Sequence, residues 1–461
     1  MTNYQWIMER FEQHKNSSCY IHNNREVTYA DLIGKINEYR EYLNSNHIKA
    51  GDCVAIAGEY SEELISLFLA LTLNKNIIIP LAGDHKDNYD KFFKIGEASY
   101  FIRISDDNKP VLGRVENYSN HPFLEQIRAE GEAGLILFSS GTTGEPKAAV
   151  HVMSKLIEKY KQQGSRSFRA LIFLKIDHIG GINTLFSIML NGGTIVTASS
   201  RSGEDVCKSI EKNKVNLLPT TPTFLNLLIM SQAYKKYTLD SLQLITYGTE
   251  PMVQSTLDLL NKLFPQVKIK QTFGLTELGI FSTKSKDSKS TWMKIGQDDM
   301  QIRIVDNILH VKANSAMKGY LNAPSPFDEN GWYNTGDLVE VEGEYMKILG
   351  RKGDLINVGG EKVYPSEVES IILSVDCVKD VLVKGKSNPI TGQIVQAVIV
   401  LVDGANEQEA KEKINTACRD QLDSYKVPRL ITFVKEDLHG ERFKKRRNLS
   451  PVGSQITCNA I

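Results

Sequence analysis

The sequence feature that most constrains the fold is a regular alternation of short apolar runs with helical patterns between residues 53 and 273. The apolar runs cover residues 53–57, 76–81, 135–138, 170–176, 193–198, 215–218, 242–247 and 268–273. Strands that alternate with helices along a chain assemble into parallel sheets with helices on their faces. We therefore expect an α/β fold with layered, largely parallel sheets.

The pattern changes after residue 300. Apolar and polar residues alternate from 301 to 313 as in an antiparallel sheet, residues 343–349 indicate another strand, and a polar break follows at 351–354. The residues beyond the break have the pattern of a compact α+β unit. We predict a large N-terminal domain over residues 1–350 that includes an antiparallel β subdomain, a linker at 351–354, and a small C-terminal domain over 355–461.

Charge and cysteine usage exclude several classes of function. Lys+Arg and Asp+Glu number 55 each, so the chain has no overall field that would attract nucleic acid or an anionic membrane. The six cysteines lie far apart without a Cys-x-x-Cys pair, which argues against zinc and against a disulfide scaffold. No uninterrupted apolar window of about 18 residues occurs, and the N-terminus leads straight into charged helical sequence. We expect a cytoplasmic protein with no membrane span and no nucleic-acid partner.

One polar loop carries the first sign of chemistry. After the apolar run at 135–138 the chain continues with Ser139, Ser140, Gly141, Thr142, Thr143, Gly144, Glu145, Pro146 and Lys147. Glycines let a backbone approach a polyphosphate closely, and hydroxyls and a lysine supply donors and charge, so the stretch suits phosphate binding. It is not a Walker loop, because Glu145 and Pro146 separate Gly144 from Lys147. On composition alone, a surface turn without a ligand explains the stretch equally well.

Four further segments complete a recognisable pattern. They are Tyr247-Gly248-Thr249-Glu250-Pro251, Gln271-Thr272-Phe273-Gly274-Leu275-Thr276-Glu277, Gly331-Trp332-Tyr333-Asn334-Thr335-Gly336-Asp337, and the stretch from Gly350-Arg351 through Gly359-Gly360-Glu361 to Glu369. With these segments in this order, the chain resembles, over nearly its whole length, the adenylate-forming superfamily of acyl-CoA and aryl-CoA synthetases, adenylation domains and luciferases.

The resemblance implies a two-step reaction. The chain would join a carboxylic acid to ATP with release of pyrophosphate, and then transfer the acyl group to the thiol of CoA or of a carrier protein's phosphopantetheine. The implied cofactors and partners are ATP, Mg²⁺, a small carboxylic acid, and CoA or a separate acyl or aryl carrier protein. The alternative is a nucleotide-binding, catalytically weakened member that acts as an interaction or regulatory protein, because Ala148 stands where relatives usually have Gly and the lysine segment near the C-terminus is altered.

The resemblance also assigns the ATP site. Residues 139–147 would hold the β- and γ-phosphates, Thr276 would bond the α-phosphate, and Glu277 would hold Mg²⁺, which prefers carboxylate and phosphate oxygens. Asp337 would accept hydrogen bonds from the ribose hydroxyls, and Arg351 would reinforce this contact. The adenine would lie against the backbone wall of Gly248, Thr249, Glu250 and Pro251, with Gln271, Thr272, Phe273 and Gly274 beside the nucleotide.

The catalytic lysine is where the chain departs from the family pattern. Members usually carry it after a glycine, whereas this chain has five cations between residues 442 and 447, interrupted by Phe443. Aligning Arg447 with the family pattern puts Lys444 at the catalytic position and leaves Lys445 as its rival. As an isolated feature, such a run is typical of a solvated basic tail.

The resemblance further implies that the small domain is mobile. Related enzymes pivot it at the segment that corresponds to 351–354, where this chain has Gly353 and Asp354. After the rotation, Gly359, Gly360 and Glu361 would line the channel for the thiol.

The acid pocket is implied by the segment around His178, which aligns with the residue beside the substrate carboxylate, although a lone histidine is more often structural. Amino-acid-activating relatives use an aspartate here, whereas Asp177 lies one position away, so we expect an acid without an α-amino group. Apolar or small walls suited to an aryl or medium-length acyl group would come from Leu217, Leu218, Thr223, Phe224, Thr246 and Gly248. Core packing explains the leucines equally well.

Overall fold

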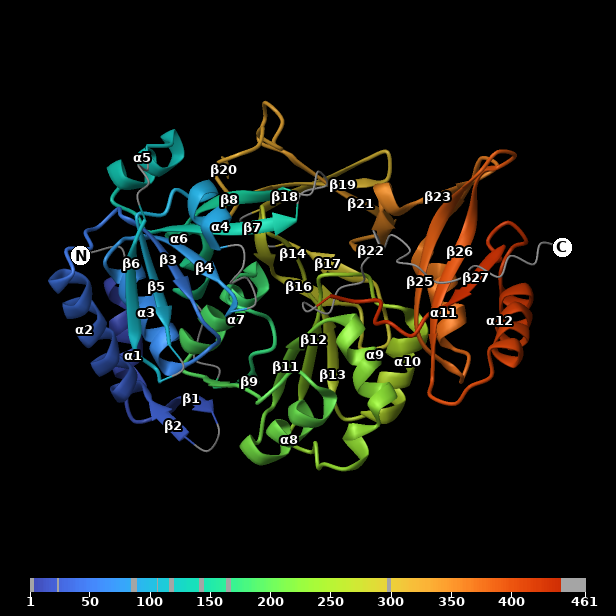
Figure 1. Cartoon of the computed structure of the whole chain (residues 1–461), viewed down its shortest axis with the longest axis horizontal. Coiled ribbons are helices and arrows are strands. Elements are labelled where there is room, and N and C mark those ends of the chain that lie inside the picture. Colours follow the sequence, from blue (N-terminus) through green and yellow to red (C-terminus); the bar gives the residue numbers. More distant parts are fainter. Residues whose placement is uncertain are drawn as a thin grey trace.

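Two seven-stranded sheets form the centre of a large domain, and a separate sheet forms a small one (Figure 1). The computed structural model describes residues 4–22, 25–83, 89–105, 107–115, 120–140, 145–162, 167–296 and 300–440. In Figure 1 the large domain runs from blue to yellow and orange, and the small domain, in orange and red, follows β22 (Tyr345–Arg351).

The first sheet has four parallel strands in its middle and antiparallel strands at its edges. Its order is β20 (Gly319–Tyr320), β8 (Pro146–Val152), β7 (Gly134–Ser140), β4 (Ile77–Leu81), β3 (Cys53–Ala57), β5 (Tyr100–Ile104) and β6 (Pro110–Arg114). The phosphate-loop segment therefore connects two neighbouring antiparallel strands, β7 and β8.

The second sheet is parallel except for its last strand. Its order is β13 (Lys268–Gln271), β12 (Leu244–Tyr247), β11 (Leu217–Thr220), β9 (Arg169–Leu171), β10 (Thr194–Val196), β1 (Ser18–His22) and β2 (Arg25–Thr28). The expected α/β fold with largely parallel sheets is confirmed. Two predicted strands end early, because β9 stops at Leu171 rather than 176 and the run at 268–273 divides at Thr272.

Alternating burial in the strands explains how the layers form. In β3, Val54 and Ile56 face a core shared with the second sheet, whereas Cys53, Ala55 and Ala57 face the opposite side. The shared core contains α3 (Glu62–Leu73) and α7 (Ile179–Met189), which meet where Phe68 and Phe186 lie 5.8 Å apart. These two helices are apolar nearly all round, as expected for a central layer.

The remaining helices of the large domain pack either into the shared core or on the far face of one of the two sheets. The shared core also receives α1 (Gln5–Gln13), α2 (Tyr29–Ser45) and α6 (Met153–Ile157). The far face of the first sheet is covered by α4 (Tyr89–Ile95) and α5 (Pro122–Ala129), and that of the second by α8 (Gly203–Asn213), α9 (Pro222–Ser231) and α10 (Gln254–Leu263). Each sheet is thus buried on both faces, as parallel sheets require.

An antiparallel sheet completes the large domain, as the alternation after residue 300 predicts. Its order is β16 (Thr283–Ser285), β17 (Met293–Ile295), β22, β21 (Tyr333–Glu342), β19 (Ile308–Ala313) and β18 (Met300–Val305). The hairpin of β14 (Phe273–Leu275) and β15 (Gly279–Phe281) contributes Phe273 and Phe281 to the core of this sheet.

The small domain has its own sheet and its own apolar core. After the 3₁₀ turn η4 (Lys352–Asp354) its elements are β23 (Ile356–Val358), β24 (Glu361–Val363), α11 (Pro365–Leu373), β25 (Val378–Asn388), β26 (Gly392–Leu401), α12 (Glu407–Gln421) and β27 (Leu430–Phe433). Side-chain hydrogen bonds join it to the large domain: Asn226 Nδ2 donates to the carbonyl of Lys379 at 3.1 Å, Ser255 Oγ to that of Ser370 at 3.0 Å, and Ser366 Oγ to that of Leu349 at 3.0 Å.

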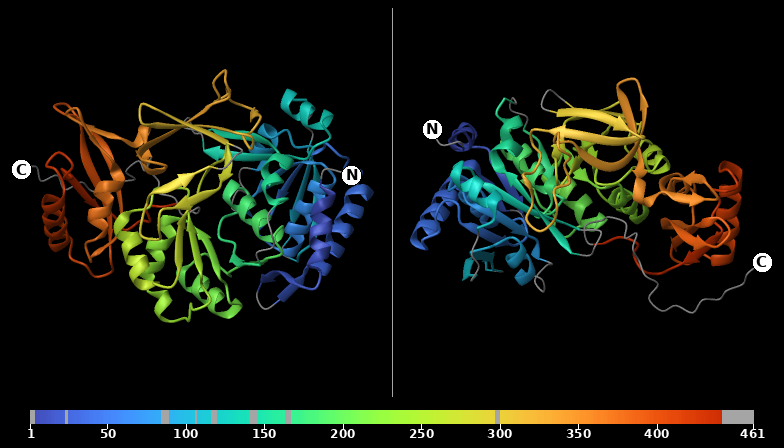
Figure 2. Two further views of the ribbon diagram at one scale, coloured as in Figure 1. Left: turned by 180° about the vertical axis from the view of Figure 1, so that it is seen from behind. Right: turned by 90° about the horizontal axis from the view of Figure 1, so that it is seen from above.

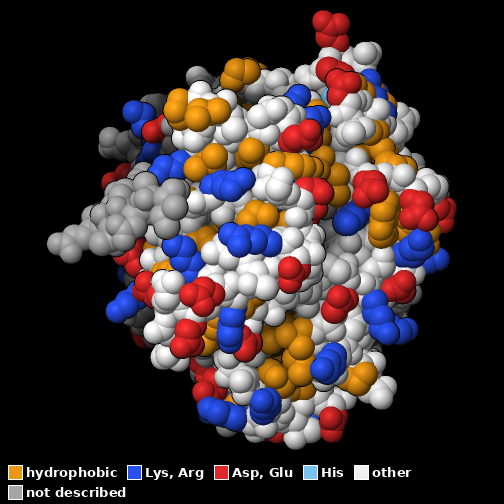
Figure 3. All heavy atoms as spheres, turned by 90° about the vertical axis from the view of Figure 1, so that its right-hand side faces the viewer, with side chains coloured by type: hydrophobic (Ala, Val, Ile, Leu, Met, Phe, Trp, Pro, Cys, Tyr) orange, Lys and Arg blue, Asp and Glu red, His pale blue; other side chains and the backbone are white. Residues whose placement is uncertain are grey.

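The surface of the molecule on the small-domain side carries cations and anions side by side. Figure 3 shows Lys, Arg, Asp and Glu side chains interspersed over this face, without a continuous field of one sign. Among the described residues, each helix is too short or too polar to cross a membrane.

Candidate functional site

A cavity of about 220 Å³ brings together residues from most of the motifs singled out in the sequence. The predicted residues that line it are Ser139, His178, Thr246, Gly248, Thr249, Thr272, Gly274, Thr276, Glu277 and Arg351. Several of them follow the carboxyl ends of β11, β12 and β13, where open parallel sheets bind their ligands. Residues separated by more than two hundred positions therefore share one site.

One wall of the cavity contains a position that requires glycine. A Cβ on Gly248 would lie 2.5 Å from Thr272 Oγ1, so only glycine fits beside this hydroxyl. Thr272 Oγ1 in turn donates to the carbonyl of Tyr247 at 3.0 Å, which holds the two segments together. The next residue, Thr249, has a φ of 75°, a conformation that is uncommon outside glycine and is seen at ligand-binding sites.

Glu277 is the buried carboxylate of the cavity. The hydroxyl of Tyr320 donates to Glu277 Oε1 at 2.5 Å, and Lys147 Nζ lies 5.4 Å from the centre of the Tyr320 ring. The other carboxylate oxygen accepts no hydrogen bond from the described residues. A single carboxylate with one available oxygen fits Mg²⁺, which binds one or two carboxylates together with substrate phosphates.

Tyr320 was not among the residues predicted from the sequence. It belongs to β20, which pairs with β8 so that Tyr320 lies opposite Ala149, two residues after Lys147. Burial and the neighbouring Glu277 carboxylate both raise the pKa of the Tyr320 phenol. It therefore remains a hydrogen-bond donor to Glu277 throughout the physiological pH range.

Asp337 and Arg351 face each other across the pair β21 and β22. Arg351 Nε lies 3.5 Å from Asp337 Oδ1, and Arg351 lines the cavity. Asp337 is buried, and the loss of hydration raises its pKa to about 6, while Arg351 and Thr335 act in the opposite direction. Near neutral pH this carboxylate is ionised and can accept hydrogen bonds from a pair of hydroxyls.

His178 has both a structural contact and a place at the cavity. It is the N-cap of α7, where its Nδ1 accepts from the backbone N–H of Gly180 at 3.0 Å. Because Nδ1 is the acceptor, the neutral ring carries its proton on Nε2. The structural and the binding interpretations of this histidine are therefore compatible.

The comparison with known proteins agrees with this geometry. Residues 7–321 match the family model described as AMP-binding enzyme, and residues 367–445 match that described as AMP-binding enzyme C-terminal domain. The chain belongs to the AMP-binding enzyme family. The predicted place in the adenylate-forming superfamily is confirmed.

Similar members of the family act on several acids. A 2-succinylbenzoate–CoA ligase of Bacillus subtilis is 25% identical over 459 residues, covering 92% of each chain, and a long-chain-fatty-acid–CoA ligase of Mycobacterium tuberculosis is 24% identical over 94% of this chain and 95% of its own. Among solved structures, an anthranilate CoA ligase in complex with anthranoyl-AMP has a TM-score of 0.82 at 19% identity, covering 95% of each chain. The o-succinylbenzoate CoA synthetase of Bacillus subtilis with its acyl-adenylate has a TM-score of 0.71 at 21% identity and 96% coverage.

Several predicted residues of this AMP-binding enzyme lie away from the cavity. Leu217, Leu218 and Phe224 are buried in the core, and Phe224 packs against Phe173 with ring centres 4.3 Å apart, so they do not wall the cavity. Core packing is the interpretation that their positions support. The ring centres of Phe273 and Phe281 lie 6.2 Å apart inside another core cluster. The side-chain oxygen of Gln271 accepts a hydrogen bond from the Tyr247 hydroxyl, so both predicted nucleotide-side residues have structural contacts.

The side chain of Glu250 has a structural contact instead of a place at the cavity. Its Oε1 accepts from the backbone N–H of Thr223 at 2.8 Å, in the first turn of α9. Together with Pro251 and Thr223 it lines a smaller cavity between the two domains. The predicted adenine wall would therefore consist of the backbone of this segment and not of the Glu250 side chain.

The hinge and thiol-channel residues lie outside the cavity. Gly353 and Asp354 are in η4, between the two domains, and Gly359, Gly360 and Glu361 form the exposed turn between β23 and β24. In Figures 1 and 2 the described residues after β27, 434–440, run from the small domain back toward the large one. The predicted Gly141, Thr142, Thr143, Gly144, Lys444 and Lys445, and the side chain of Ser140, lie outside the described residues.

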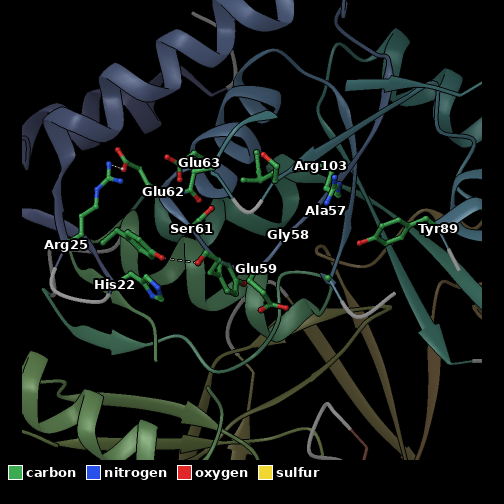
Figure 4. A pocket seen from close by; sticks show the side chains of 16 residues that line it. His22, Arg25, Ala57, Gly58, Glu59, Ser61, Glu62, Glu63, Tyr89 and Arg103 are labelled. Atoms are coloured by element: carbon green, nitrogen blue, oxygen red, sulfur yellow. Dashed lines mark hydrogen bonds and ion pairs between the residues drawn. The ribbon is translucent and has the colours of Figure 1, made fainter. Parts of the chain in front are cut away.

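A larger cavity, of about 740 Å³, lies elsewhere in the large domain and is lined by other residues (Figure 4). It lies at the carboxyl ends of β3 and β5, and Figure 4 shows Arg25 paired with Glu62 at its rim. Among the residues that the structure describes, its walls contain none from the five motifs. The smaller cavity is therefore the candidate site.

Proposed function

We propose that this protein activates a carboxylic acid with ATP and then transfers the acyl group to the thiol of CoA. A carboxylate oxygen of the acid attacks the α-phosphorus, and the bond to the β-phosphate oxygen breaks, so that an acyl adenylate forms and pyrophosphate leaves. The thiol sulfur then attacks the acyl carbon, loses its proton to water, and releases AMP. The convergence of Ser139, Gly248, Thr276, Glu277 and Arg351 on one cavity is the observation that carries this proposal.

The residues of the cavity have distinct tasks in the first step. The Thr276 hydroxyl donates to the α-phosphate, and Ser139 begins the segment that holds the other phosphates. Glu277, fixed by the Tyr320 hydroxyl, is the residue that would hold Mg²⁺. When bound, the metal offsets the charge of the leaving pyrophosphate.

The nucleoside and the acid lie on opposite sides of the α-phosphate in this proposal. Asp337 accepts from the ribose hydroxyls and Arg351 supports it, while Gly248, which has no Cβ, lets Thr272 pack against the backbone wall on which the adenine would lie. His178 Nε2–H is directed to the carboxylate of the acid. Lys444 would bridge the carboxylate and the α-phosphate, since a compact ammonium can contact both as charge moves between them.

The acceptor is proposed from the relatives. Both curated relatives named above are CoA ligases, which favours CoA over a carrier protein's phosphopantetheine. The thiol would approach after the small domain pivots at Gly353 and brings Gly359 and Gly360 to the cavity. The alternative of a catalytically weakened protein has no support. Glu277 and Arg351 line the cavity, and Asp337 lies beside Arg351.

Pyrophosphate release over a panel of aryl, fatty and amino acids tests the first step. We expect release with at least one acid lacking an α-amino group, and a fall of about 10² to 10³ in rate in Lys444→Ala, which removes a preorganised cation. Lys445→Ala is the matched control and should retain the activity. Absence of release with every acid by folded protein would contradict the proposal, and loss in Lys445→Ala alone would move the catalytic role to Lys445.

A further inference from the structure

A hydrogen-bond network behind the acid side of the cavity fixes the orientation of one of its walls. Asn183 on α7 lines the cavity, and its Oδ1 lies 2.8 Å from Lys159 Nζ and 2.7 Å from the Tyr160 hydroxyl. Both partners belong to the 3₁₀ turn η2 (Glu158–Tyr160). Lys159 Nζ also donates to the carbonyl of Ile280 at 2.7 Å, so the ammonium is held in place.

The chemistry of lysine decides which way the Asn183 amide faces. An ammonium group can only donate, so the amide atom next to Lys159 must be the oxygen. With two donors on Oδ1, the Nδ2 group is the part of the amide left for the cavity, and no described residue accepts from it. The side chain is only partly buried, which leaves these N–H groups within reach of a ligand.

The same network strengthens Asn183 as a donor. A cation and a hydroxyl on Oδ1 draw electron density toward that oxygen, and hydrogen bonds in such a chain reinforce one another. The positive charge of Lys159 behind the amide also favours an electron-rich group in front of it. A carbonyl or a carboxylate oxygen fits this position better than an alkyl group.

A second wall residue points to a polar ligand. Thr220, at the end of β11, is 2% exposed, and its hydroxyl has no partner among the described residues. It lines the same cavity as Asn183. Thr184, in contrast, donates its hydroxyl to the carbonyl of Gly180 within α7 and is satisfied. Buried hydroxyls without partners are rare unless a ligand or water completes them.

We propose that Asn183 and Thr220 form a subsite for a second oxygen acceptor of the acid, so that the substrate is a keto acid or a dicarboxylic acid. The inference rests on the proposed function and narrows it. Apolar contacts for the carbon skeleton come from Leu174, Ile179 and Pro219. The apolar walls expected from Leu218 and Phe224 are absent, so polar groups supply the specificity of this pocket.

Matched pairs of acids test the subsite. Pyrophosphate release is measured for pentanoate against levulinate and glutarate, and for benzoate against phthalate and isophthalate. We expect kcat/KM for at least one acid with the added oxygen to exceed that of its plain partner by about tenfold to a hundredfold, the usual effect of pairing an otherwise unmet donor. Equal values within every pair would overturn the subsite.

Three variants assign the preference to these residues. Asn183→Leu, which preserves size, should reduce the preference to about twofold or less, and Thr220→Val should reduce it in part. Asn37→Leu, at an exposed position of α2, is the control and should leave the preference unchanged. A preference that persists in both Asn183→Leu and Thr220→Val would overturn the assignment, even if overall rates fall.

Failure of the subsite and failure of the proposed function have different signatures. Turnover of plain acids without preference would contradict the subsite and leave acid activation intact. Absence of pyrophosphate release with every acid, by protein that unfolds cooperatively, would contradict both.

Discussion

The protonation of Asp337 links its burial to nucleotide binding. Burial raises the pKa of this carboxyl from 3.8 to about 6, so the folded protein keeps a proton that the unfolded chain has already lost between these values. Stability from this group is thus present at low pH and declines as pH rises through that window. The ionised form, which would accept hydrogen bonds from the ribose hydroxyls in the proposed site, is favoured above about pH 6.

We predict that affinity for adenosine falls as pH drops below about 6, because protonated Asp337 has lost one strong acceptor. Adenosine is the suitable probe, since it has no phosphate that titrates in this range. Calorimetric titration at several pH values measures the effect, and Asp337→Asn should bind more weakly with a flat pH profile. Identical profiles for both proteins would show that another group controls binding.

The residues that the sequence identified and those it missed differ in a physical way. Motif residues such as Gly248 and Thr276 lie in short segments whose order along the chain resembles the adenylate-forming superfamily, and this resemblance is what groups them in the sequence. Tyr320 and Asn183 depend on partners 43 and 24 positions away, contacts that no local pattern encodes. The sequence does not distinguish Leu218 and Phe224 from pocket residues, because the apolar walls of a pocket and an apolar core have the same pattern in sequence.

At the scale of one element, helix α7 depends on His178 for its N-terminus. The ring caps the backbone N–H of Gly180, and β9 ends at Leu171 because the following residues form the loop that leads to this cap. Gly181 is required in the first turn, since a Cβ there would lie 2.0 Å from the carbonyl oxygen of Lys175. The same segment therefore shapes the helix and one side of the cavity.

We predict that His178→Ala lowers the free energy of unfolding by about 1 kcal/mol through the lost cap, whereas His178→Asn, a favoured N-cap, does not. Both variants should lower kcat/KM for pyrophosphate release, because both remove the Nε2–H donor. Urea unfolding and steady-state kinetics on the same preparations measure the two effects. Normal activity in His178→Asn would assign His178 a structural role alone.

At the scale of the whole molecule, the proposed mechanism requires the small domain to change its pose between the two half-reactions. In this structure the turn at Gly359 and Gly360 is exposed and away from the cavity. Side-chain hydrogen bonds between the domains help to hold this pose, and they involve Asn226, Ser255 and Ser366. Such a contact is weak enough to be exchanged for another during a catalytic cycle.

Gly353 is the position at which this exchange can be blocked selectively. Proline fixes φ near −65° and cannot follow a large backbone rotation. The present pose should nevertheless accept it, because a Cβ on Gly353 meets no atom within 4 Å and the φ of Gly353 lies outside the left-handed region. We therefore predict that Gly353→Pro keeps most of its pyrophosphate release and loses at least tenfold in acyl-CoA formation. Gly353→Ala, which permits rotation, is the matched control, and both half-reactions are followed with one acid and CoA. An equal loss of the two in Gly353→Pro would mean that residue 353 supports the fold of the site rather than the change of pose.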